Sequence, residues 1–232
     1  MTQQQDNQLA FASPVLLFGA APVMQSTMES VEHMAGWPVL AADGGLANAR
    51  NCGLLPEVVI GDMDSASDLD QLPASVHRIL LTGQDDTDFE KSLHIISAPL
   101  IVGIGFLGGR FDHALAVLDT LARLPDDRPV LLIGDHDVLL RLRGDFTATL
   151  PLASRLSVWP LGRQHFQASA GLEWPLDDIT MAVGTRTGTS NRVIDQSVSI
   201  QPANGDGYAV IAPFEVFALM LDAAMRIAAV TR

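Results

Sequence analysis

Short apolar runs alternate with helix-like segments over the first 140 residues of this chain, and this alternation restricts its fold more than any other feature. The candidate strands lie at residues 15–18, 39–42, 58–61, 78–81, 100–104 and 130–133. The candidate helices lie between them, at residues 24–34, 46–52, 88–97 and 112–124. Continuous apolar strands separated by helices are typical of a parallel sheet that is covered on both faces. We therefore expect a doubly wound, mainly parallel, Rossmann-like α/β domain at residues 14–142, with ligands bound beyond the carboxyl ends of its strands.

The pattern changes after about residue 143. Short alternating runs appear at residues 146–150, 156–159, 179–183, 198–201 and 208–212, separated by Gly, Pro and Asp. Such runs predict a small antiparallel β-domain, a sandwich or a barrel, at residues 143–213. The remaining segment, residues 214–232, has no helix breaker after Pro213 and is predicted to be a helical extension.

The composition limits the partners that the chain can bind. Its net charge is −13, which argues against a broad basic surface for nucleic acid, although a local negative field can attract a cationic small molecule. Cys52 is the only cysteine, so we expect a small buried side chain in a reducing compartment. The apolar runs are shorter than the roughly 20 residues that span a membrane. The polar, Gln-rich start predicts a disordered tail at residues 1–13 of a cytoplasmic protein.

Two carboxylates follow the apolar run at residues 58–61. Asp62 and Asp64 are separated only by Met63, and alternate side chains of an extended strand point to the same side. Carboxylates held that close repel each other unless a proton or a cation lies between them. A hard ion such as Mg²⁺, carrying a phosphate substrate, is the natural occupant. The alternative is a solvated acidic turn that is capped by Ser65.

A second acidic cluster runs from Gln84 to Lys91. Thr87 and Glu90 have the spacing of a capping box, which predicts that a helix begins at Asp88. The helix dipole favours a carboxylate in the first turn, and this alone would account for Asp88. The functional interpretation makes Asp88 a third carboxylate for the same metal ion. Lys91 is the only lysine of the chain and could reach a phosphate as a point charge.

A glycine-rich turn at residues 103–113 leads from a predicted strand into a predicted helix. Gly108 and Gly109 would let backbone N–H groups approach phosphate oxygens, and a helix N-terminus favours anions. Arg110 supplies a fork-shaped donor that suits phosphate. Asp112 is equally well explained as the N-cap of the helix, and we expect His113 to be structural.

A third turn follows the predicted strand at residues 39–42. Asp43 could accept a hydrogen bond from a ribose hydroxyl, and Gly44 and Gly45 would leave room for a nucleotide. An ordinary turn is an equally good interpretation of these three residues alone.

Taken in chain order, these motifs resemble the thiamine pyrophosphokinase family. The resemblance rests on six segments, at residues 42–45, 56–65, 84–91, 108–113, 171–176 and 188–191. Each is modest evidence by itself, but the ordered set is specific and extends over roughly residues 14–212. The family has an α/β nucleotide domain followed by a β-sandwich, and works as a homodimer with active sites between subunits.

The resemblance implies a thiamine diphosphokinase, which transfers a pyrophosphoryl group from ATP to the hydroxyl of thiamine and releases AMP. It implies Mg²⁺ held by Asp62, Asp64 and Asp88. The implied catalytic residues are Asp62, Asp64, Asp88, Lys91 and Arg110. The implied nucleotide contacts are Asp43, Gly44, Gly45, Ser65, Thr87, Gly108, Gly109 and Asp112. The implied thiamine contacts are Gln84, Trp174, Ser190 and Asn191, of which the last three would lie opposite another chain's carboxylates.

The chain departs from the family's pattern at a few positions. Met63 replaces a phenylalanine, Glu173 stands where lysine is common, and Leu46 interrupts the usual Asp-Gly-Gly-Ala-Asn order. Asn48 is for that reason only a weak candidate for a site residue. Trp174 could also be a core residue of the β-domain.

Three other functions remain compatible with the residues. The chain could be a pyrophosphokinase of the same architecture that acts on another alcohol, such as a hydroxymethylpterin. It could be a non-catalytic nucleotide or thiamine sensor, although crowded carboxylates argue against a pure binding protein. An unrelated Mg²⁺-dependent phosphatase built on the two aspartates is the third alternative.

Overall fold

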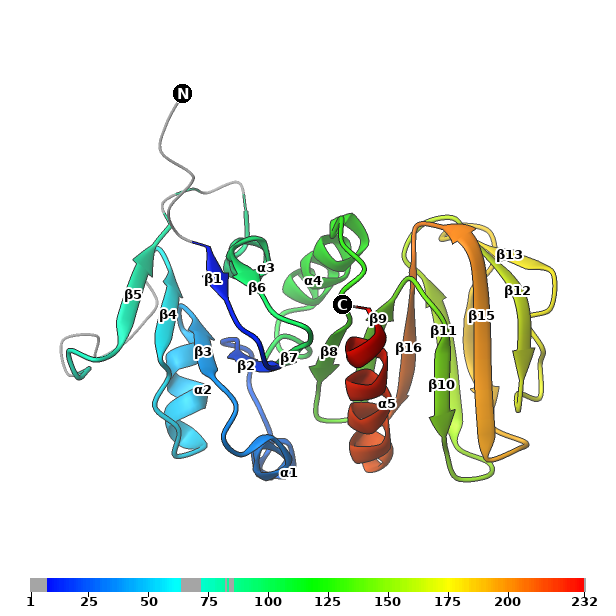
Figure 1. Cartoon of the computed structure of the whole chain (residues 1–232), viewed down its shortest axis with the longest axis horizontal. Coiled ribbons are helices and arrows are strands. Elements are labelled where there is room, and N and C mark those ends of the chain that lie inside the picture. Colours follow the sequence, from blue (N-terminus) through cyan, green and yellow to red (C-terminus); the bar gives the residue numbers. More distant parts are fainter. Residues whose placement is uncertain (1–7, 64–71, 82, 84–85, 232) are drawn as a thin grey trace. The chain divides into compact units, whose positions relative to one another are not determined.

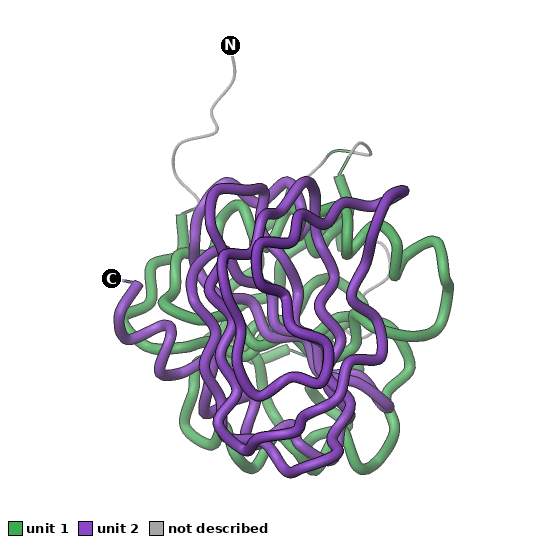
Figure 2. The backbone as a smooth tube through the Cα atoms, turned by 90° about the vertical axis from the view of Figure 1, so that its right-hand side faces the viewer, with its two compact units in different colours: residues 1–120 green, residues 121–232 purple. Residues whose placement is uncertain are grey.

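The computed structural model describes residues 8–63, 72–81, 83 and 86–231. Its core is built on buried apolar strands. The chain divides into two units, Met1–Thr120 and Leu121–Arg232 (Figure 2). The first unit contains a parallel sheet with helices, and the second contains antiparallel sheets. The predicted fold class, a doubly wound α/β region followed by an antiparallel β-sandwich, is confirmed.

Five parallel strands form the sheet of the first unit, in the order β7-β2-β3-β4-β5 (Figure 1). Their bounds are Val15–Phe18 for β2, Val39–Ala42 for β3, Val58–Gly61 for β4, His77–Leu80 for β5 and Ile101–Ile104 for β7. Every residue of β2, β3, β4 and β7 is buried, as expected for strands covered on both faces. The strand predicted at residues 78–81 is shifted by one residue from β5, and the strand predicted at residues 100–104 begins one residue before β7.

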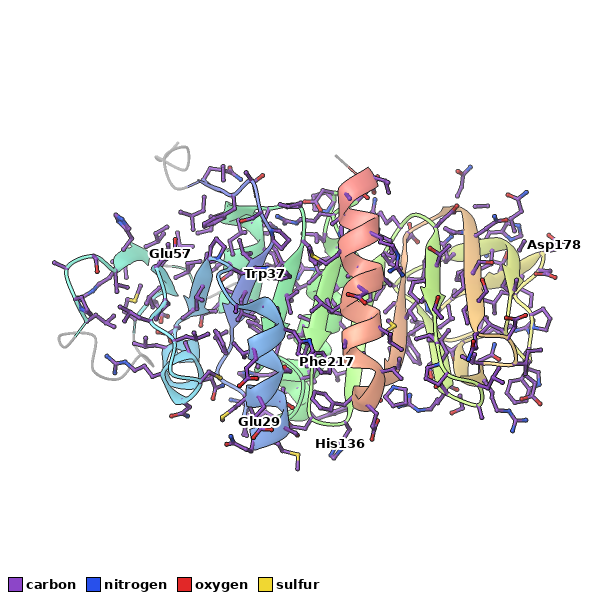
Figure 3. The ribbon with its side chains drawn as sticks, turned by 60° about the horizontal axis from the view of Figure 1, so that its bottom comes forward. Glu29, Trp37, Glu57, His136, Asp178 and Phe217 are labelled. Atoms are coloured by element: carbon purple, nitrogen blue, oxygen red, sulfur yellow. The ribbon has the colours of Figure 1, made fainter. Side chains whose placement is uncertain are left out.

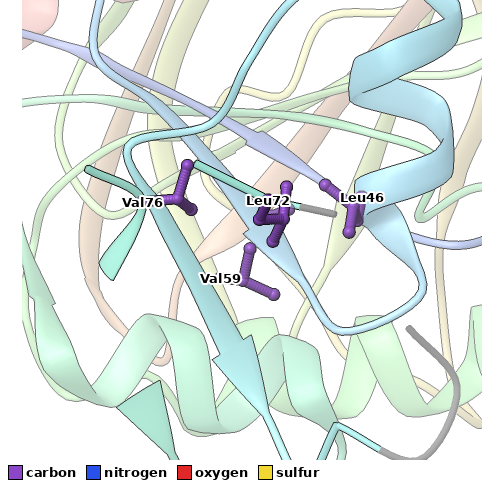
Figure 4. Close-up of a cluster of buried hydrophobic side chains, with 5 residues drawn as sticks. Leu46, Val59, Leu72 and Val76 are labelled. Carbon is purple, nitrogen blue, oxygen red and sulfur yellow. The ribbon is translucent and has the colours of Figure 1, made fainter. Parts of the chain in front are cut away.

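Helices lie between these strands in the sequence, and α4 follows the last of them. They are α1 at Gln25–Glu29, the 3₁₀ helix η1 at Ser30–Met34, α2 at Gly45–Asn51, α3 at Asp88–Ile95 and α4 at Phe111–Arg123. Helix α2 packs on β2 and β3, and α3 packs on β3 and β4. Figure 4 shows the resulting hydrophobic cluster, in which Leu46 of α2 lies with Val59 of β4 and with Leu72 and Val76.

A short strand pair corrects two predictions. β1, Leu9–Ala10, pairs in parallel with β6, Ile96–Ser97. The predicted helix at residues 88–97 therefore ends at Ile95, because the next two residues pair as a strand. The prediction of a disordered tail at residues 1–13 does not hold for Leu9–Ala10; residues 1–7 lie outside the described part of the chain.

The second unit contains two antiparallel sheets, in the orders β14-β11-β16-β9-β8 and β10-β15-β12-β13. The first sheet consists of β8 at Val130–Ile133, β9 at Asp137–Leu142, β11 at Arg155–Pro160, β14 at Gly188–Arg192 and β16 at Tyr208–Pro213. The second consists of β10 at Phe146–Thr149, β12 at Gln164–Ala170, β13 at Ile179–Met181 and β15 at Ser197–Gly205. The rings of Phe166 and Tyr208 meet edge to face between the two sheets, with centroids 5.2 Å apart.

Two fully buried polar side chains fix the interior of this unit. Arg141 on β9 donates to the carbonyls of Leu124, Asp126 and Arg128, and burial lowers the pKa of its guanidinium to about 10. The hydroxyl of Tyr208 donates a 2.9 Å hydrogen bond to the carbonyl of Gly144.

The predicted helical extension after Pro213 is present. It consists of η3, Phe214–Val216, and α5, Phe217–Val230, which packs on β8, β9, β10 and β16. The rings of Phe214 and Phe217 stack with centroids 5.2 Å apart where the two helices join. Within the described ranges, no helix combines the length and apolar character needed to cross a membrane.

Candidate functional site

The carboxyl ends of the parallel strands in the first unit surround a pocket of about 590 Å³. The segments that follow β2, β3, β4 and β7 line this pocket, together with the N-terminal parts of α3 and α4. Doubly wound sheets bind their ligands at this edge. The predicted site residues that line the pocket are Asp43, Gly44, Asp62, Thr87, Asp88, Lys91, Gly108 and Arg110.

Asp43 and Asp88 both lie close to residue 61, which is a glycine and has no side chain. A Cβ atom on Gly61 would lie 2.8 Å from Cβ of Asp43 and 3.3 Å from Oδ1 of Asp88. The φ angle of Gly61 is 150°, a conformation that residues with side chains rarely adopt. The glycine that ends β4 thus lets acidic residues from two other elements lie beside it.

The turn that begins at Asp43 joins β3 to α2. The N–H of Asp43 donates to the carbonyl of Ile60 at 2.7 Å, and the residue has a φ of 41° and is 2% exposed. Aspartate tolerates this left-handed conformation better than most residues. Gly44 lines the pocket, whereas Gly45 begins α2 at a point where a side chain would collide with the carbonyl of Phe18.

The predicted alternation of Asp62, Met63 and Asp64 does not continue as a strand. β4 ends at Gly61, and the φ of Met63 is 67°, so the backbone turns there. The inference that an extended strand aligns the two carboxylates is therefore wrong at Met63. Met63 packs against the cluster of Figure 4, as expected for a side chain directed to the core. Asp62, which lies between the end of β4 and Met63, lines the pocket.

Three predicted site residues lie outside the described residues. They are Asp64, Ser65 and Gln84. Their assigned roles stay predictions from the sequence.

The start of α3 is built as the sequence predicts. Thr87 precedes the helix, and its Oγ1 accepts a hydrogen bond of 3.2 Å from the N–H of Glu90. Asp88 lies in the first turn, and Nζ of Lys91 donates to its Oδ1 at 3.3 Å. The side chain of Lys91 is only 9% exposed and that of Asp88 is 34% exposed. A nearly buried ammonium group and a carboxylate therefore share the wall of the pocket.

Glycine is required at two positions of the turn after β7. Gly108 and Gly109 have φ angles of 110° and 64°. Gly108 lines the pocket, whereas Gly109 does not: a Cβ atom there would lie 2.9 Å from Cδ of Pro22. The turn is thus held against the segment that follows β2.

Arg110 is paired with Asp112, two residues later. Its Nε donates to Oδ1 at 3.1 Å and its Nη2 to Oδ2 at 2.5 Å. The hydrogen bond from Arg110 lowers the pKa of Asp112 and the same bond raises the pKa of Arg110. The side chains are 70% and 64% exposed, so water screens the pair and a phosphate can replace the carboxylate. The prediction that Asp112 is the N-cap is wrong, because α4 begins at Phe111 and Asp112 lies in its first turn.

The donors around the pocket have the chemistry that a magnesium ion requires. Asp43, Asp62 and Asp88 offer carboxylate oxygens, the ligands preferred by hard cations. Within the described residues, no three His, Cys, Asp or Glu side chains are close enough together to hold an ion. Asp64, the remaining predicted ligand, lies outside the described residues.

Of the predicted thiamine contacts, Trp174, Ser190 and Asn191 lie in the second unit. Trp174 is 56% exposed, so the alternative of a core tryptophan is wrong. Asn191 is buried, and its side-chain amide accepts from the N–H and donates to the carbonyl of Trp174, at 3.1 and 2.6 Å. Ser190 is exposed, with a φ of 60°. Asn191 thus fixes the backbone beneath an exposed indole ring.

Glu173, which stands where the family often has lysine, forms an ion pair with Arg192. The guanidinium donates to both carboxylate oxygens. The hydrogen bond lowers the pKa of Glu173 and raises that of Arg192.

The sequence patterns missed several residues that line the pocket. Residues 19–22 and Gly105 contribute backbone, and Phe89 and Phe106 form an aromatic contact with ring centroids 4.6 Å apart. His113 also lines the pocket. The end of a predicted strand at residue 18 could have indicated residues 19–22, because ligand sites lie beyond strand ends. These residues were missed because they are small and have no polar side chain.

A second cavity of about 390 Å³ in the first unit contains the only cysteine. Met28, Trp37 and Cys52 line it, with Glu29 at the end of α1 (Figure 3). Burial raises the pKa of the Cys52 thiol, which keeps it protonated. Cys52 is half-buried, so the prediction of a fully buried side chain is wrong.

Two family models match the chain. One is described as "Thiamin pyrophosphokinase, catalytic domain" and matches residues 35–137. The other is described as "Thiamin pyrophosphokinase, vitamin B1 binding domain" and matches residues 152–205. The first range contains Asp43, Asp62, Asp88 and Lys91, and the second contains Trp174.

Individual proteins show the same relationship. Thiamine pyrophosphokinases 1 and 2 of Arabidopsis thaliana are 28% and 30% identical to the chain over 172 and 173 residues. Each match covers 63% of the chain, and the chain spans 61% of the length of each relative. The crystal structure of thiamin pyrophosphokinase from Geobacillus thermodenitrificans has a TM-score of 0.70 at 21% identity, over 86% of this chain and 97% of that one. At this identity the likeness concerns the fold.

Proposed function

This chain belongs to the thiamin pyrophosphokinase family, and we propose that it transfers the pyrophosphoryl group of ATP to the hydroxyl of thiamine. The products would be thiamine diphosphate and AMP. The observation that supports this most is the pocket in which Asp43, Asp62 and Asp88 lie with Lys91 at the carboxyl ends of the strands. Carboxylates together with an ammonium group suit a polyphosphate that carries a divalent cation better than they suit an uncharged ligand.

In the proposed reaction the hydroxyl oxygen of thiamine forms a bond to the β-phosphorus of ATP. The bond from that phosphorus to the oxygen bridging the α-phosphorus breaks, and AMP leaves with the bonding electrons. The hydroxyl proton passes to a carboxylate, for which we propose Asp88. Chemistry of this kind depends chiefly on positioning and on neutralising charge.

The basic residues of the pocket would hold the polyphosphate. Lys91 is already placed by its hydrogen bond to Asp88, so its ammonium group needs little reorganisation to donate to a phosphate oxygen. Arg110 would exchange the carboxylate of Asp112 for a phosphate, which its planar fork can bind with two hydrogen bonds.

Asp62, Asp64 and Asp88 would hold the magnesium ions. Bound Mg²⁺ supplies positive charge that neutralises the phosphate oxygens and orients the polyphosphate. The carboxylates of the chain hold that charge in place, and Gly61 keeps Asp88 near Asp43.

We also propose that thiamine binds against Trp174, with Ser190 and Gln84 as further contacts and Asn191 fixing the tryptophan backbone. The exposed indole ring of Trp174 offers a face that attracts the cationic ring of thiamine. In the proposed homodimer, the thiamine contacts of one subunit complete the pocket of the other. A cytoplasmic location remains a prediction.

One assay tests the proposed reaction against its alternatives. Purified protein is incubated with ATP, Mg²⁺ and thiamine, and AMP and thiamine diphosphate are measured together. Equal amounts of both products are expected. Binding of ATP without AMP would instead indicate a sensor, and phosphate release without thiamine would indicate a phosphatase. AMP formation that depends on a hydroxymethylpterin in place of thiamine would indicate the related pyrophosphokinase.

A further inference from the structure

Asn48 is a buried polar residue of α2 that binds a loop of the pocket from behind. Its side chain is 9% exposed. Its Nδ2 donates to the carbonyl of Gly19 at 2.7 Å and to the carbonyl of Ala21 at 2.9 Å. Both acceptors belong to residues 19–22, which follow β2 and which we name the β2 loop. One side-chain amide has two N–H donors, and here both are used on a single loop.

The β2 loop is held on another side by the segment that follows β7. The N–H of Gly19 donates to the carbonyl of Ile104 at 2.7 Å, and the N–H of Ala21 donates to that of Gly105 at 2.9 Å. The φ of Gly105 is 80°, and a Cβ atom there would lie 2.9 Å from Nδ2 of Asn48 and would collide with the carbonyl of Gly19. The β2 loop and the segment after β7 therefore meet backbone to backbone, and the side chain of Asn48 binds the same loop from α2.

These contacts leave one amide of the loop available. The N–H groups of Gly19 and Ala21 donate within the protein, and Pro22 has none. Within the described part of the chain, no group accepts a hydrogen bond from the N–H of Ala20. Ala20 lines the 590 Å³ pocket. The remaining N–H donor of the loop thus belongs to a residue that lines the pocket.

The position of the loop in the sheet favours a ligand contact. In the strand order β7-β2-β3, the next strand after β2 in the chain, β3, lies on one side of β2, and the later strand β7 lies on its other side. Open α/β sheets bind ligands beyond the carboxyl ends at such a switch point. The β2 loop begins there, and backbone amides are common donors to phosphate oxygens.

We propose that Asn48 is a positioning residue for the nucleotide: it holds the β2 loop so that the N–H of Ala20 donates to a phosphate oxygen of ATP. The identity of the ligand rests on the proposed function. Asparagine suits the task because its amide supplies two N–H donors. Aspartate has the same shape but no donor, and its negative charge would face two carbonyl oxygens. Asn48 does not touch the nucleotide itself.

The test compares Asn48→Asp and Asn48→Ala with Asn51→Asp and Asn51→Ala. Asn51 is exposed at the last residue of the same helix, which makes it a matched control. ATP binding is measured by calorimetry, turnover by AMP release, and stability by thermal unfolding. We expect the Asn48 variants to bind ATP about tenfold more weakly or worse, with kcat and the KM for thiamine changed by less than about threefold. The Asn51 variants should match the wild type.

A folded Asn48 variant that binds ATP as tightly as the wild type would overturn the proposal, even if its melting temperature falls. If neither Asn48 variant folds, hydrogen exchange on the wild-type protein decides: ATP must slow exchange of the Ala20 amide, and unchanged exchange overturns the proposal. Failure of the proposed function is distinguishable, because wild-type protein that binds ATP without forming thiamine diphosphate still allows the comparison of affinities.

Discussion

The ammonium group of Lys91 lies 3.3 Å from Oδ1 of Asp88, one helical turn earlier, and both side chains line the same pocket. Lys91, proposed to bind the polyphosphate, and Asp88, proposed to hold Mg²⁺ and to accept the hydroxyl proton, thus hold each other in place before the substrates bind. The pair is only partly accessible to water, so its attraction is less screened than that of a surface ion pair.

Replacing Lys91 with methionine should lower kcat/KM by about 100-fold, because it removes a preorganised positive charge and keeps a similar stem. Lys91→Arg should retain more activity, since it keeps the charge in a different shape. Steady-state kinetics with ATP and thiamine checks both changes. Arg226→Met, at an exposed position of α5, is the control for loss of one cation. Wild-type kinetics in Lys91→Met would remove this residue from the mechanism.

Replacing Asp62 or Asp88 with asparagine should reduce turnover by about 100-fold or more, and the remaining activity should require a higher Mg²⁺ concentration. Asp64→Asn, at the position known only from the sequence, should behave in the same way. Asp119→Asn, on an exposed position of α4 outside the pocket, serves as control. Removal of Mg²⁺ with a chelator should stop the reaction of the wild type. Variants with an unchanged Mg²⁺ dependence would contradict the metal assignment.

The Gly61→Ala substitution should both destabilise the protein and impair it. The added methyl group would meet Asp43 and Asp88 at a backbone angle that alanine rarely adopts, at a cost of about 1–3 kcal/mol. Urea unfolding measures the stability, and AMP release measures the activity. Gly144→Ala introduces the same methyl group where no atom lies within 4 Å, and should change neither. A Gly61→Ala enzyme with full activity would show that the spacing of the two carboxylates is unimportant.

Trp174→Ala should raise the KM for thiamine and leave the KM for ATP nearly unchanged, because the ring is proposed to contact only thiamine. Equal effects on both values would count against this placement. Mixing Trp174→Ala with Asp88→Asn tests the shared site as well. If subunits exchange and each site uses both chains, activity at a thiamine concentration far below the KM of Trp174→Ala should recover to about a quarter of the wild-type value. No recovery under conditions that exchange subunits would assign each site to one chain.

Tyr208→Phe should lower stability at pH 7 by about 1–2 kcal/mol, since the carbonyl of Gly144 loses its donor. Burial, reinforced by Asp145, raises the pKa of Tyr208. A raised pKa means that the stabilisation is complete below the unfolded-state pKa of about 10 and is lost as pH rises above it. The difference between wild type and Tyr208→Phe should therefore shrink by about 1.4 kcal/mol between pH 7 and pH 11. Urea unfolding of both proteins at the two pH values measures this, and a constant difference would contradict it.

The sequence predicts the first unit well because its strands must bury both faces. Runs such as Val15–Phe18 and Val58–Gly61 contain nothing polar, and their bounds agree with the structure. The start of α3 at Asp88 follows from the capping side chain of Thr87. In these segments local chemistry and tertiary structure favour the same conformation.

Two of the strands that the sequence did not predict are polar, whereas a third, β9 at Asp137–Leu142, is mostly apolar. β12 and β14, Gln164–Ala170 and Gly188–Arg192, lack a clear alternation of apolar residues, so their pairing partners rather than their composition decide their conformation. Helix α1 is followed by the 3₁₀ helix η1 from Ser30, and the spacing of the apolar residues does not predict this change.

The carboxylates and the lysine of the site were predicted because charged side chains are conspicuous in an apolar sequence. The β2 loop was not, because its sequence Gly-Ala-Ala-Pro carries no functional group in its side chains. Its contribution depends on Asn48, 29 positions from Gly19 in the sequence, and such a contact becomes visible only in the folded chain. The same reason explains the error at Met63, where a left-handed residue ends the strand.

Gly19 and Gly105 line the pocket and Gly61 lies behind its carboxylates, and a methyl group added at any of the three would meet neighbouring atoms. A surface of this kind cannot be remodelled by exchanging one side chain for another, since every substitution adds atoms to occupied space. Adaptation to a different acceptor alcohol would have to proceed at residues that still have room around them. Redesign of the protein should accordingly leave these three glycines untouched and vary the solvent-facing rim of the pocket.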